Sequence, residues 1–217
     1  MNNMEQARYN MVEQQVRPCN IHDENVLDLF IKLKREKFAP ALYQELAFSD
    51  LEVPLPGGQA MLSPRVEAML LQELAITKTD KILEIGTGSG YITALLAKMA
   101  DFVYSIEINE INRQLAIKNL TYAGINNVSV IAGDGLEGLL SKAPFDKILL
   151  GGGLSSVPAL LKSQLKINGK LIGLFGTRPV LSAVLVERVG ENKYTDKKLF
   201  ETDVEYLVGE HIAQFRF

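Results

Sequence analysis

Apolar and polar residues alternate along the middle of the chain in a way that predicts strands and helices in turn. From residue 64 to about residue 176, short apolar runs are separated by stretches in which apolar residues recur every three or four positions. Strands that alternate with helices indicate a parallel sheet covered on both faces. The expected elements are helix 64–74, strand 81–86, helix 90–99, strand 102–107, helix 110–123, strand 128–132, strand 145–150, helix 157–165 and strand 170–176.

The residues before this block predict two helices and a loop. Tyr9, Val12 and Val16 have the spacing of one helix face, and Pro18 ends that helix. The stretch HDENVLDLFIKLK predicts a second helix with Asp23 as its N-cap, and the basic residues of KLKREK indicate a solvated helix end. The stretch EVPLPGGQAML contains two prolines and two glycines, so we expect a loop there.

The stretch after residue 176 predicts strands rather than helices. SAVLVERVG and DVEYLV alternate β-branched and apolar residues, which favours antiparallel strands that complete the sheet. The expected fold class is therefore α/β, with a doubly wound, mostly parallel sheet and an N-terminal helical extension. We divide the chain into an N-terminal helical segment, 1–63, and a core with antiparallel C-terminal strands, 64–217.

Composition and charge exclude several classes of protein. The 217 residues are 47% hydrophobic and 23% charged with a net charge of −3, so nothing attracts the whole chain to nucleic acid or an anionic membrane. The single cysteine, Cys19, rules out an internal disulfide, and the two histidines lack the spacing of a zinc site. Because the first residues are unlike a secretory signal and no apolar run is long enough for a membrane span, we expect a cytoplasmic protein.

A glycine-rich turn follows the first strand of the core. LEIGTGSGY carries Gly86, Gly88 and Gly90, where glycine permits a tight turn and the next helix offers free N–H groups to a ligand. A dinucleotide fingerprint would place its third glycine at position 91, which is Tyr91. The pattern G-x-G-x-G, preceded by Glu84, favours a ligand with an amino-acid-like tail over a pyrophosphate. A glycine turn without a ligand is the alternative.

Two acids follow the next two strands. Glu107 ends strand 102–107, where a carboxylate can accept hydrogen bonds from both hydroxyls of a ribose or can cap the following helix. Asp134 follows strand 128–132, where a carboxylate could accept a hydrogen bond from an adenine amino group or belong to an ordinary Asp-Gly turn. Because parallel strands of this kind end at one edge of the sheet, the three loops are expected to meet there.

In order and spacing, these three stretches resemble the class I S-adenosylmethionine (SAM)-dependent methyltransferases. The resemblance implies that Gly86 and Gly88 line the methionine part of SAM, that Glu107 holds its ribose and that Asp134 meets its adenine. The implied set of cofactor-binding residues is Glu84, Gly86, Thr87, Gly88, Gly90, Tyr91, Glu107, Ile108, Asp134 and Gly135.

A narrower resemblance covers nearly the whole chain. Several stretches resemble the protein-L-isoaspartate O-methyltransferase family in their order and in their residues: MVEQQV, VPLPGGQAMLSP, ILEIGTGSGY, GDGLEG and LKINGKLI. The resemblance implies a seven-stranded, Rossmann-like sheet with an altered order of the final strands. It also implies that the N-terminal segment supplies part of the substrate pocket.

The chain departs from that family on the substrate side. The family pattern G-Q-T-I-S-x-P falls on positions 58–64, so its Thr and Ser positions hold Ala60 and Leu62, which carry no hydroxyl. Leu62 and the neighbouring Ser63 are the candidate catalytic residues at this substrate-side position, and helix capping is the alternative for Ser63. Glu205 stands where the family has a basic residue, which is unfavourable for a substrate carboxylate.

A carboxylate that accepts a methyl group needs no catalytic base, because it is ionised at neutral pH and reacts best when aligned in a dry pocket. His22 and His211 could serve as bases but are expected as surface or capping residues, and Cys19 is expected to be packed. Residues 151–156 follow the fourth parallel strand, and they either line the acceptor side or form a turn in which Ser156 caps a helix.

The sequence therefore predicts a SAM-dependent O-methyltransferase of the protein-L-isoaspartate type. Its expected substrate is an isoaspartyl residue in a damaged protein or peptide, with no metal, nucleic acid or membrane involved. Two alternatives stay open: a methyltransferase of the same fold with another protein or small-molecule acceptor, and a SAM-binding protein without catalysis. A nicotinamide dehydrogenase is disfavoured by Tyr91 and the GDG segment.

Overall fold

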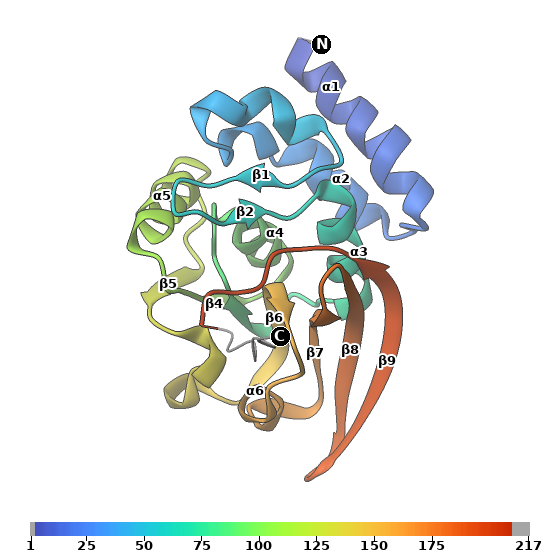
Figure 1. Cartoon of the computed structure of the whole chain (residues 1–217), viewed down its shortest axis with the longest axis vertical. Helices are drawn as coiled ribbons and strands as arrows, with labels where there is room; N and C mark the ends of the chain where they lie inside the picture. Colours follow the sequence, from blue (N-terminus) through green and yellow to red (C-terminus); the bar gives the residue numbers. More distant parts are fainter. Residues whose placement is uncertain (1–2, 210–217) are drawn as a thin grey trace, which may run out of the picture.

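The computed structural model of the protein describes residues 3–209. One sheet of seven strands forms its centre (Figure 1). The strands are β3 (Lys81–Ile85), β4 (Phe102–Glu107), β5 (Val128–Ala132), β6 (Phe145–Leu154), β7 (Leu165–Thr177), β8 (Val180–Gly190) and β9 (Lys193–Thr202). Their order across the sheet is β5-β4-β3-β6-β7-β8-β9. The pairs from β5 through β7 are parallel, and the pairs β7–β8 and β8–β9 are antiparallel. The predicted α/β class with an antiparallel end is confirmed.

The last strand does not lie where the sequence placed it. DVEYLV was expected to form a strand, but within it Tyr206 makes only an isolated bridge to Gly153. The strand that pairs with β8 is β9, which precedes this stretch. β9 lacks the continuous apolar run that is typical of a buried strand, because most of its side chains are exposed or half-buried. The apolar residues of DVEYLV serve another purpose, described below.

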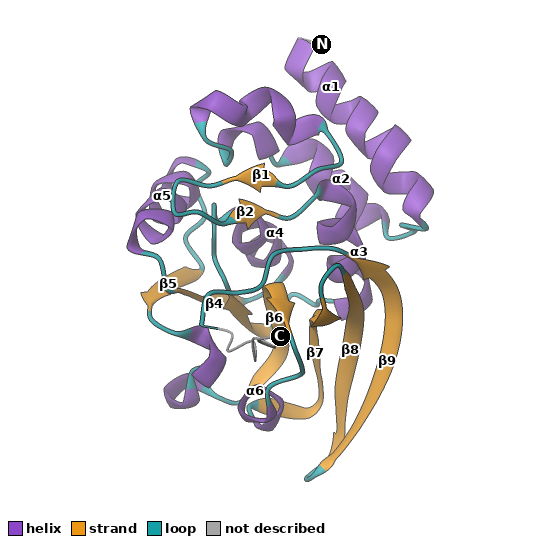
Figure 2. Cartoon of the chain, in the orientation of Figure 1, coloured by secondary structure: helices purple, strands orange, loops and turns teal. Residues whose placement is uncertain are grey.

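Helices lie on both sides of the sheet (Figure 2). They are α1 (Asn3–Met11), α2 (Glu24–Lys32), α3 (Pro64–Leu74), α4 (Tyr91–Met99), α5 (Glu110–Tyr122) and α6 (Ala159–Ser163). Short 3-10 helices occur at Arg17–Cys19, Arg35–Lys37, Ala41–Phe48, Gly135–Glu137 and Leu140–Lys142, and α1 continues as a π-helical turn over Val12–Val16. The two helices predicted in the N-terminal segment are therefore present, and α6 is shorter than predicted.

Alternating side chains of the strands build two apolar clusters, one on each face of the sheet. In β3, Ile82 joins one cluster, while Leu83 and Ile85 join the other. The first cluster also takes in the apolar residues of α1 to α5, whereas the second contains Leu161 of α6 and Phe145. The sheet is thus covered on both faces, as the alternating pattern predicted.

The basic stretch KLKREK is only in part the solvated helix end that was expected: α2 ends at Lys32, and Lys32, Lys34 and Lys37 are exposed, but the two residues between Lys34 and Lys37 are not. Arg35 and Glu36 are buried, and each forms a buried ion pair: Arg35 with Glu67 of α3, and Glu36 with Arg8 of α1 at 2.5 Å. Charged groups this deep require a partner, because desolvation strongly disfavours an isolated charge. The local charge pattern was consistent with exposure, but the partners lie far away in the sequence.

The stretch EVPLPGGQAML forms a small hairpin instead of an unpaired loop. Two short strands, β1 (Val53–Pro54) and β2 (Ala60–Met61), pair in antiparallel fashion. Gly58 adopts a φ of 82° at the turn, a conformation that favours glycine. In Figure 1 the hairpin and the N-terminal helices stand above the sheet.

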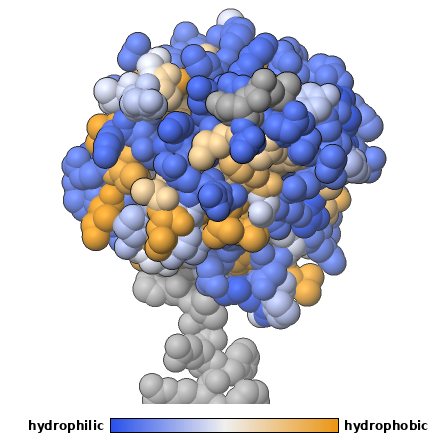
Figure 3. All heavy atoms as spheres, turned by 90° about the horizontal axis from the view of Figure 1, so that it is seen from above, coloured by the Kyte–Doolittle hydropathy of each residue, from blue (hydrophilic) through white to orange (hydrophobic). Residues whose placement is uncertain are grey.

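The surface of the molecule seen from above is largely hydrophilic, with smaller hydrophobic patches among the polar residues (Figure 3). Within residues 3–209, no helix combines the length and apolar character needed to cross a bilayer.

The N-cap of α2 should contribute measurably to stability. The Asp23 carboxylate accepts a hydrogen bond from the Asn25 N–H at 2.9 Å, as predicted. We expect Asp23→Ala to cost about 1 kcal/mol of unfolding free energy, or about 2–4 °C in Tm, in thermal unfolding. The matched control is Asp28→Ala on the same helix. Asp28 pairs with Lys32 on an exposed face, so its loss should cost about 0.5 kcal/mol or less. Equal losses in the two variants would contradict the capping role.

Candidate functional site

The glycine-rich turn after β3 is built as the sequence predicted. Gly86, Gly88 and Gly90 have φ angles of 89°, 57° and 82°, which residues with a side chain rarely adopt. The Gly86 N–H donates to the carbonyl of Ile106 at 2.9 Å, which ties the turn to the end of β4. Gly90 is the N-cap of α4, and a Cβ there would lie 3.3 Å from Ala116 of α5. The turn therefore fits tightly between its neighbours.

Glu107 is held in one orientation at the end of β4. Its side chain is buried, and its two carboxylate oxygens accept from the N–H groups of Gly88 at 2.8 Å and Asn109 at 2.9 Å. One acid thus connects the glycine-rich turn to the start of α5. A carboxylate oxygen has further lone pairs, so Glu107 can still accept hydrogen bonds from a ligand.

Asp134 follows β5 and is the N-cap of the 3-10 helix Gly135–Glu137. Its Oδ1 accepts from the Leu136 N–H at 2.9 Å, so the Asp-Gly turn that the sequence allowed is present. The other carboxylate oxygen, Oδ2, faces Gly209, where an added Cβ would lie 3.4 Å away.

The ends of β3, β4 and β5 border one narrow cavity, which we call the strand-end crevice. Its free volume is about 20 Å³, enough for one or two water molecules. Of the predicted residues, Gly86, Glu107, Ile108, Asp134 and Gly135 line it. Within residues 3–209 the lining is Gln59, Ile85, Gly86, Ile106, Glu107, Ile108, Asp134, Gly135, Leu136, Leu207 and Val208. The structure therefore brings the three loops together as expected.

Five predicted residues are not in the crevice lining and lie around it. Glu84 and Thr87 are buried below the turn, where the Ser105 hydroxyl lies 2.5 Å from both the Glu84 carboxylate and the Thr87 hydroxyl. Tyr91 is turned away, with its ring packed edge-on against Phe30 and Phe38 of the N-terminal segment. The other two, Gly88 and Gly90, belong to the glycine-rich turn, where the Gly88 N–H donates to Glu107.

The stretch DVEYLV crosses the carboxyl ends of the parallel strands, and we call residues 203–209 the crossing segment (Figure 1). It is fixed to β6, because the Gly153 N–H donates to the Glu205 carbonyl and the Leu207 N–H donates to the Gly153 carbonyl, each at 2.9 Å. Its Leu207 side chain lies in the crevice wall. A Cβ added to Gly86 or to Gly152 would lie 2.9 Å from Leu207 Cδ2.

A second small cavity adjoins the crevice, and we call it the side pocket. It has a free volume of about 20 Å³ and shares Gln59 and Leu207 with the crevice. Its lining is Glu52, Gln59, Ala60, Leu62, Gly151, Gly152, Glu205, Tyr206 and Leu207. The predicted substrate-side residue Leu62 is therefore in contact with this pocket, and so is the start of the predicted stretch 151–156.

Ser63 is buried at the N-cap position of α3, with Pro64 as the first helical residue, as expected. Its hydroxyl makes no capping hydrogen bond, although its carbonyl accepts from the Glu67 N–H at 3.1 Å. Ser156 does not cap α6, which starts after Pro158.

The remaining candidate residues lie elsewhere. His22 is exposed at the start of α2, where its backbone N–H donates to the Gln72 side chain at 2.6 Å. Cys19 is half-buried and lies 3.2 Å from the carbonyl of Gln15. His211 lies outside the described residues.

The Glu205 side chain forms an ion pair with Arg178. Its carboxylate accepts from the Arg178 guanidinium at 2.5 Å, and the same guanidinium pairs with Asp203 at 2.8 Å. These two hydrogen-bonded carboxylates raise the pKa of Arg178 further above its ordinary value. Burial, and then the negative charge of Glu205, raises the pKa of Glu52 across the pocket. The side pocket is therefore bordered by acids, one of which has its charge balanced.

Sequence reasoning missed the contacts that hold the hairpin over the crevice. Asn109 Nδ2 donates to the Gly57 carbonyl at 3.1 Å, and the Gly57 N–H donates to Asn112 Oδ1 at 3.0 Å. The only local signal was Asn109 as the N-cap of α5. Gln59, which lines both cavities, follows directly after this loop.

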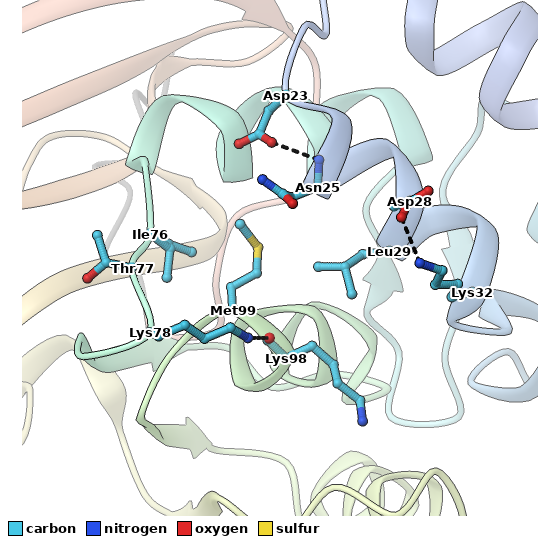
Figure 4. Close-up of a pocket in the computed structure, with 10 residues that line it drawn as sticks. All are labelled: Asp23, Asn25, Asp28, Leu29, Lys32, Ile76, Thr77, Lys78, Lys98 and Met99. Carbon is cyan, nitrogen blue, oxygen red and sulfur yellow. Dashed lines mark hydrogen bonds and ion pairs between the residues drawn. The ribbon is translucent and has the colours of Figure 1, made fainter.

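A larger cavity of about 470 Å³ lies near the opposite edge of the sheet (Figure 4). It is bordered by α2, by the end of α4 and by Thr77 and Lys78, which precede β3. Of the charged groups around it, Lys32 pairs with Asp28 at 2.6 Å, and the Lys78 ammonium donates to the Lys98 carbonyl. Because open α/β sheets bind ligands at the carboxyl ends of their strands, this cavity is not the candidate site.

Comparison with known proteins places this arrangement among methyltransferases. The family model for protein-L-isoaspartate(D-aspartate) O-methyltransferase (PCMT) matches residues 6–207. The protein-L-isoaspartate O-methyltransferase of Koribacter versatilis is 37% identical over 93% of this chain and 90% of that protein. The one from Petrotoga mobilis is 40% identical over 77% of this chain and 79% of that protein.

A solved structure shows the same fold. The PCMT of Plasmodium falciparum, in complex with S-adenosyl-L-homocysteine, matches with a TM-score of 0.80 at 21% identity, over 95% of this chain and 99% of that one. The seven-stranded methyltransferase fold expected from the sequence is thereby confirmed.

The buried acid below the glycine-rich turn should make stability depend on pH. Burial raises the pKa of Glu84 from 4.5 to about 8, although hydrogen bonds from Ser105 and Thr93 oppose the shift. Between these values the folded state binds more protons than the unfolded state, so stability falls as pH rises. Glu84→Gln cannot ionise, and we expect it to lose less stability than the wild type between pH 5 and pH 8. The difference should be on the order of a few kcal/mol in denaturant unfolding.

Part of the pH dependence should persist in this variant, because burial also raises the pKa of Glu67 to about 7. An identical pH slope in Glu84→Gln and the wild type would show that Glu84 ionises normally.

Proposed function

Because the chain belongs to the protein-L-isoaspartate(D-aspartate) O-methyltransferase family, we propose that it methylates a carboxylate of isoaspartyl residues in damaged proteins or peptides. The enzyme class and the cofactor predicted from the sequence, a methyltransferase that uses SAM, are confirmed by this membership. The roles of individual residues are proposed below from their positions.

One observation supports the cofactor site above all: a glycine-rich turn and two acids, from three neighbouring strands, border one crevice. In our proposal Glu107 accepts hydrogen bonds from the ribose hydroxyls, and its fixed orientation removes the need to reorganise on binding. Asp134 accepts from the adenine amino group, and the apolar side chains of Ile106, Ile108 and Leu136 cover the adenine. The residues present therefore fit the cofactor.

The cofactor, when bound, supplies a methyl group carried by a sulfonium. The protein's own contribution is to position the acceptor and to exclude water, because a carboxylate acceptor is ionised without a base. This agrees with the side pocket, whose lining within residues 3–209 includes no histidine, lysine or cysteine. We propose that residues 1–63 form the substrate side, since Glu52, Gln59, Ala60 and Leu62 all come from this segment.

A specific observation favours a second candidate, a methyltransferase for a different acceptor. Ala60 and Leu62 give the side pocket apolar walls, and the acids in its lining within residues 3–209 are Glu52 and Glu205. The pairing of Glu205 with Arg178 reduces the repulsion that a substrate carboxylate would meet, but Glu52 is not balanced in this way. An acceptor with less negative charge would fit this lining as well.

The test compares two peptides that differ at one residue. We expect transfer of a labelled methyl group from SAM to a peptide containing L-isoaspartate, at a rate at least 100-fold above that for the same peptide with L-aspartate. The binding of S-adenosyl-L-homocysteine, measured by calorimetry, is the control for a working cofactor site. Cofactor binding without transfer to either peptide would sink the isoaspartyl assignment and support the second candidate.

The crossing segment should limit cofactor affinity. The crevice of about 20 Å³ is too small for a nucleoside, so part of its lining has to move for the cofactor to enter, and we propose that Leu207 is the side chain that withdraws. We expect Leu207→Ala to bind S-adenosyl-L-homocysteine several-fold more tightly and Asp134→Ala to bind it several-fold more weakly, by calorimetry. Val189→Ala, on the distant end of β8, is the control and should not change the affinity. Weaker binding in Leu207→Ala would mean that this side chain contacts the cofactor instead of excluding it.

A further inference from the structure

A fully buried arginine contacts three parts of the protein that meet beside the site. Arg35 belongs to the 3-10 helix Arg35–Lys37 of the N-terminal segment and has no exposed surface. One terminal nitrogen pairs with the Glu67 carboxylate of α3, and the other donates to the Leu62 carbonyl at 2.6 Å. The guanidinium carbon also lies 5.0 Å from the centre of the Tyr91 ring.

Two of these contacts involve residues that line a cavity of the site or lie next to the glycine-rich turn. Leu62 lines the side pocket and lies just beyond the last pair of the β1–β2 hairpin, Val53 with Met61. Tyr91 is the first residue of α4, directly after the glycine-rich turn. The guanidinium therefore connects the wall of the side pocket with the helix that carries the turn.

The chemistry of the guanidinium suits a group that connects several parts of the protein. Its rigid, planar set of donors can engage a carboxylate and a carbonyl at once, while its face stacks on an aromatic ring. A buried charge carries a large desolvation cost, and replacing such a pair with apolar residues is often neutral for stability. Stability alone therefore gives a weak reason for this arrangement.

We propose that Arg35 is a positioning residue for the methyl acceptor. By holding the Leu62 peptide group against α3 and α4, it fixes the wall of the side pocket at a set distance from the glycine-rich turn. This inference rests on the proposed function for the nature of the acceptor, but the positioning itself can be measured without any substrate.

The same segment contains a matched control. Arg8 and Glu36 form a second buried ion pair, at 2.5 Å, and Arg8 also donates to a backbone carbonyl, that of Ile31 at 3.3 Å. None of these three residues lines the crevice or the side pocket. Removing this pair also takes a buried ion pair out of the N-terminal segment, but it removes no hydrogen bond to Leu62.

The experiment compares the double variants Arg35→Met/Glu67→Met and Arg8→Met/Glu36→Met. Both partners are replaced together, so no unpaired charge is left buried. For the Arg35 pair we expect KM for the isoaspartyl peptide to rise at least tenfold, while the Kd for S-adenosyl-L-homocysteine changes less than twofold. We also expect amide hydrogen exchange in residues 59–63 to become at least tenfold faster. The Arg8 pair should leave all three quantities within twofold of the wild type.

A single variant, Arg35→Lys, tests the geometry if the first double variant fails to fold. The lysine ammonium can pair with Glu67 but cannot reach the Leu62 carbonyl in the same arrangement, so we expect exchange in residues 59–63 to increase here too.

Unchanged exchange in residues 59–63, in whichever Arg35 variant folds, would overturn the inference, as would equal changes in the Arg8 pair. A wild-type protein that methylates no isoaspartyl peptide would refute the proposed function, and the exchange measurement would still decide the role of Arg35.

Discussion

The parallel pairing of β5, β4 and β3 is the constraint on which the rest of the structure depends. It brings residues that are 48 positions apart, from Gly86 to Asp134, to one edge of the sheet. Glu107 then joins the loops, because its carboxylate accepts from the glycine-rich turn on one side and from the start of α5 on the other. Without that carboxylate, the turn would keep its contacts with the sheet and the hydrogen bond that Asn119 of α5 donates to the Ser89 carbonyl, but its tie to the start of α5 would be lost.

The parts of the site that follow from local sequence were predictable. A glycine directly after an apolar strand and an acid near the end of one can both be recognised from a few neighbouring residues of sequence. Gly86, whose φ is 89°, and the acids Glu107 and Asp134 could therefore be selected in advance. The strands of the parallel sheet were predictable for a related reason, since burial on both faces demands continuous apolar runs. The edge strand β9 left no such run, because most of its side chains are exposed or half-buried.

What the sequence could not reveal are contacts between distant residues. The charges of KLKREK resembled a solvated helix end, yet Arg35 meets Glu67, 32 residues further on, and both are buried. The apolar residues of DVEYLV matched a strand, yet Leu207 fills space beside Gly86 and Gly152. The charge pattern around Arg35 wrongly indicated exposure, whereas the apolar pattern of DVEYLV correctly indicated that Leu207 is buried. In both cases only the tertiary structure supplied the partner.

The hairpin of the N-terminal segment and the crossing segment meet over the carboxyl edge of the sheet, and this shapes both cavities. Gln59 comes from the N-terminal hairpin and Leu207 from the crossing segment, and each lines the strand-end crevice and the side pocket together. A movement of Leu207 that enlarges one cavity therefore changes the wall of the other. In the proposed function, entry of the cofactor would reshape the acceptor side before the acceptor arrives, whereas the hairpin wall stays fixed by Arg35, Asn109 and Asn112. One wall that moves and one that is anchored allow a dry pocket to open for the cofactor and still align the acceptor.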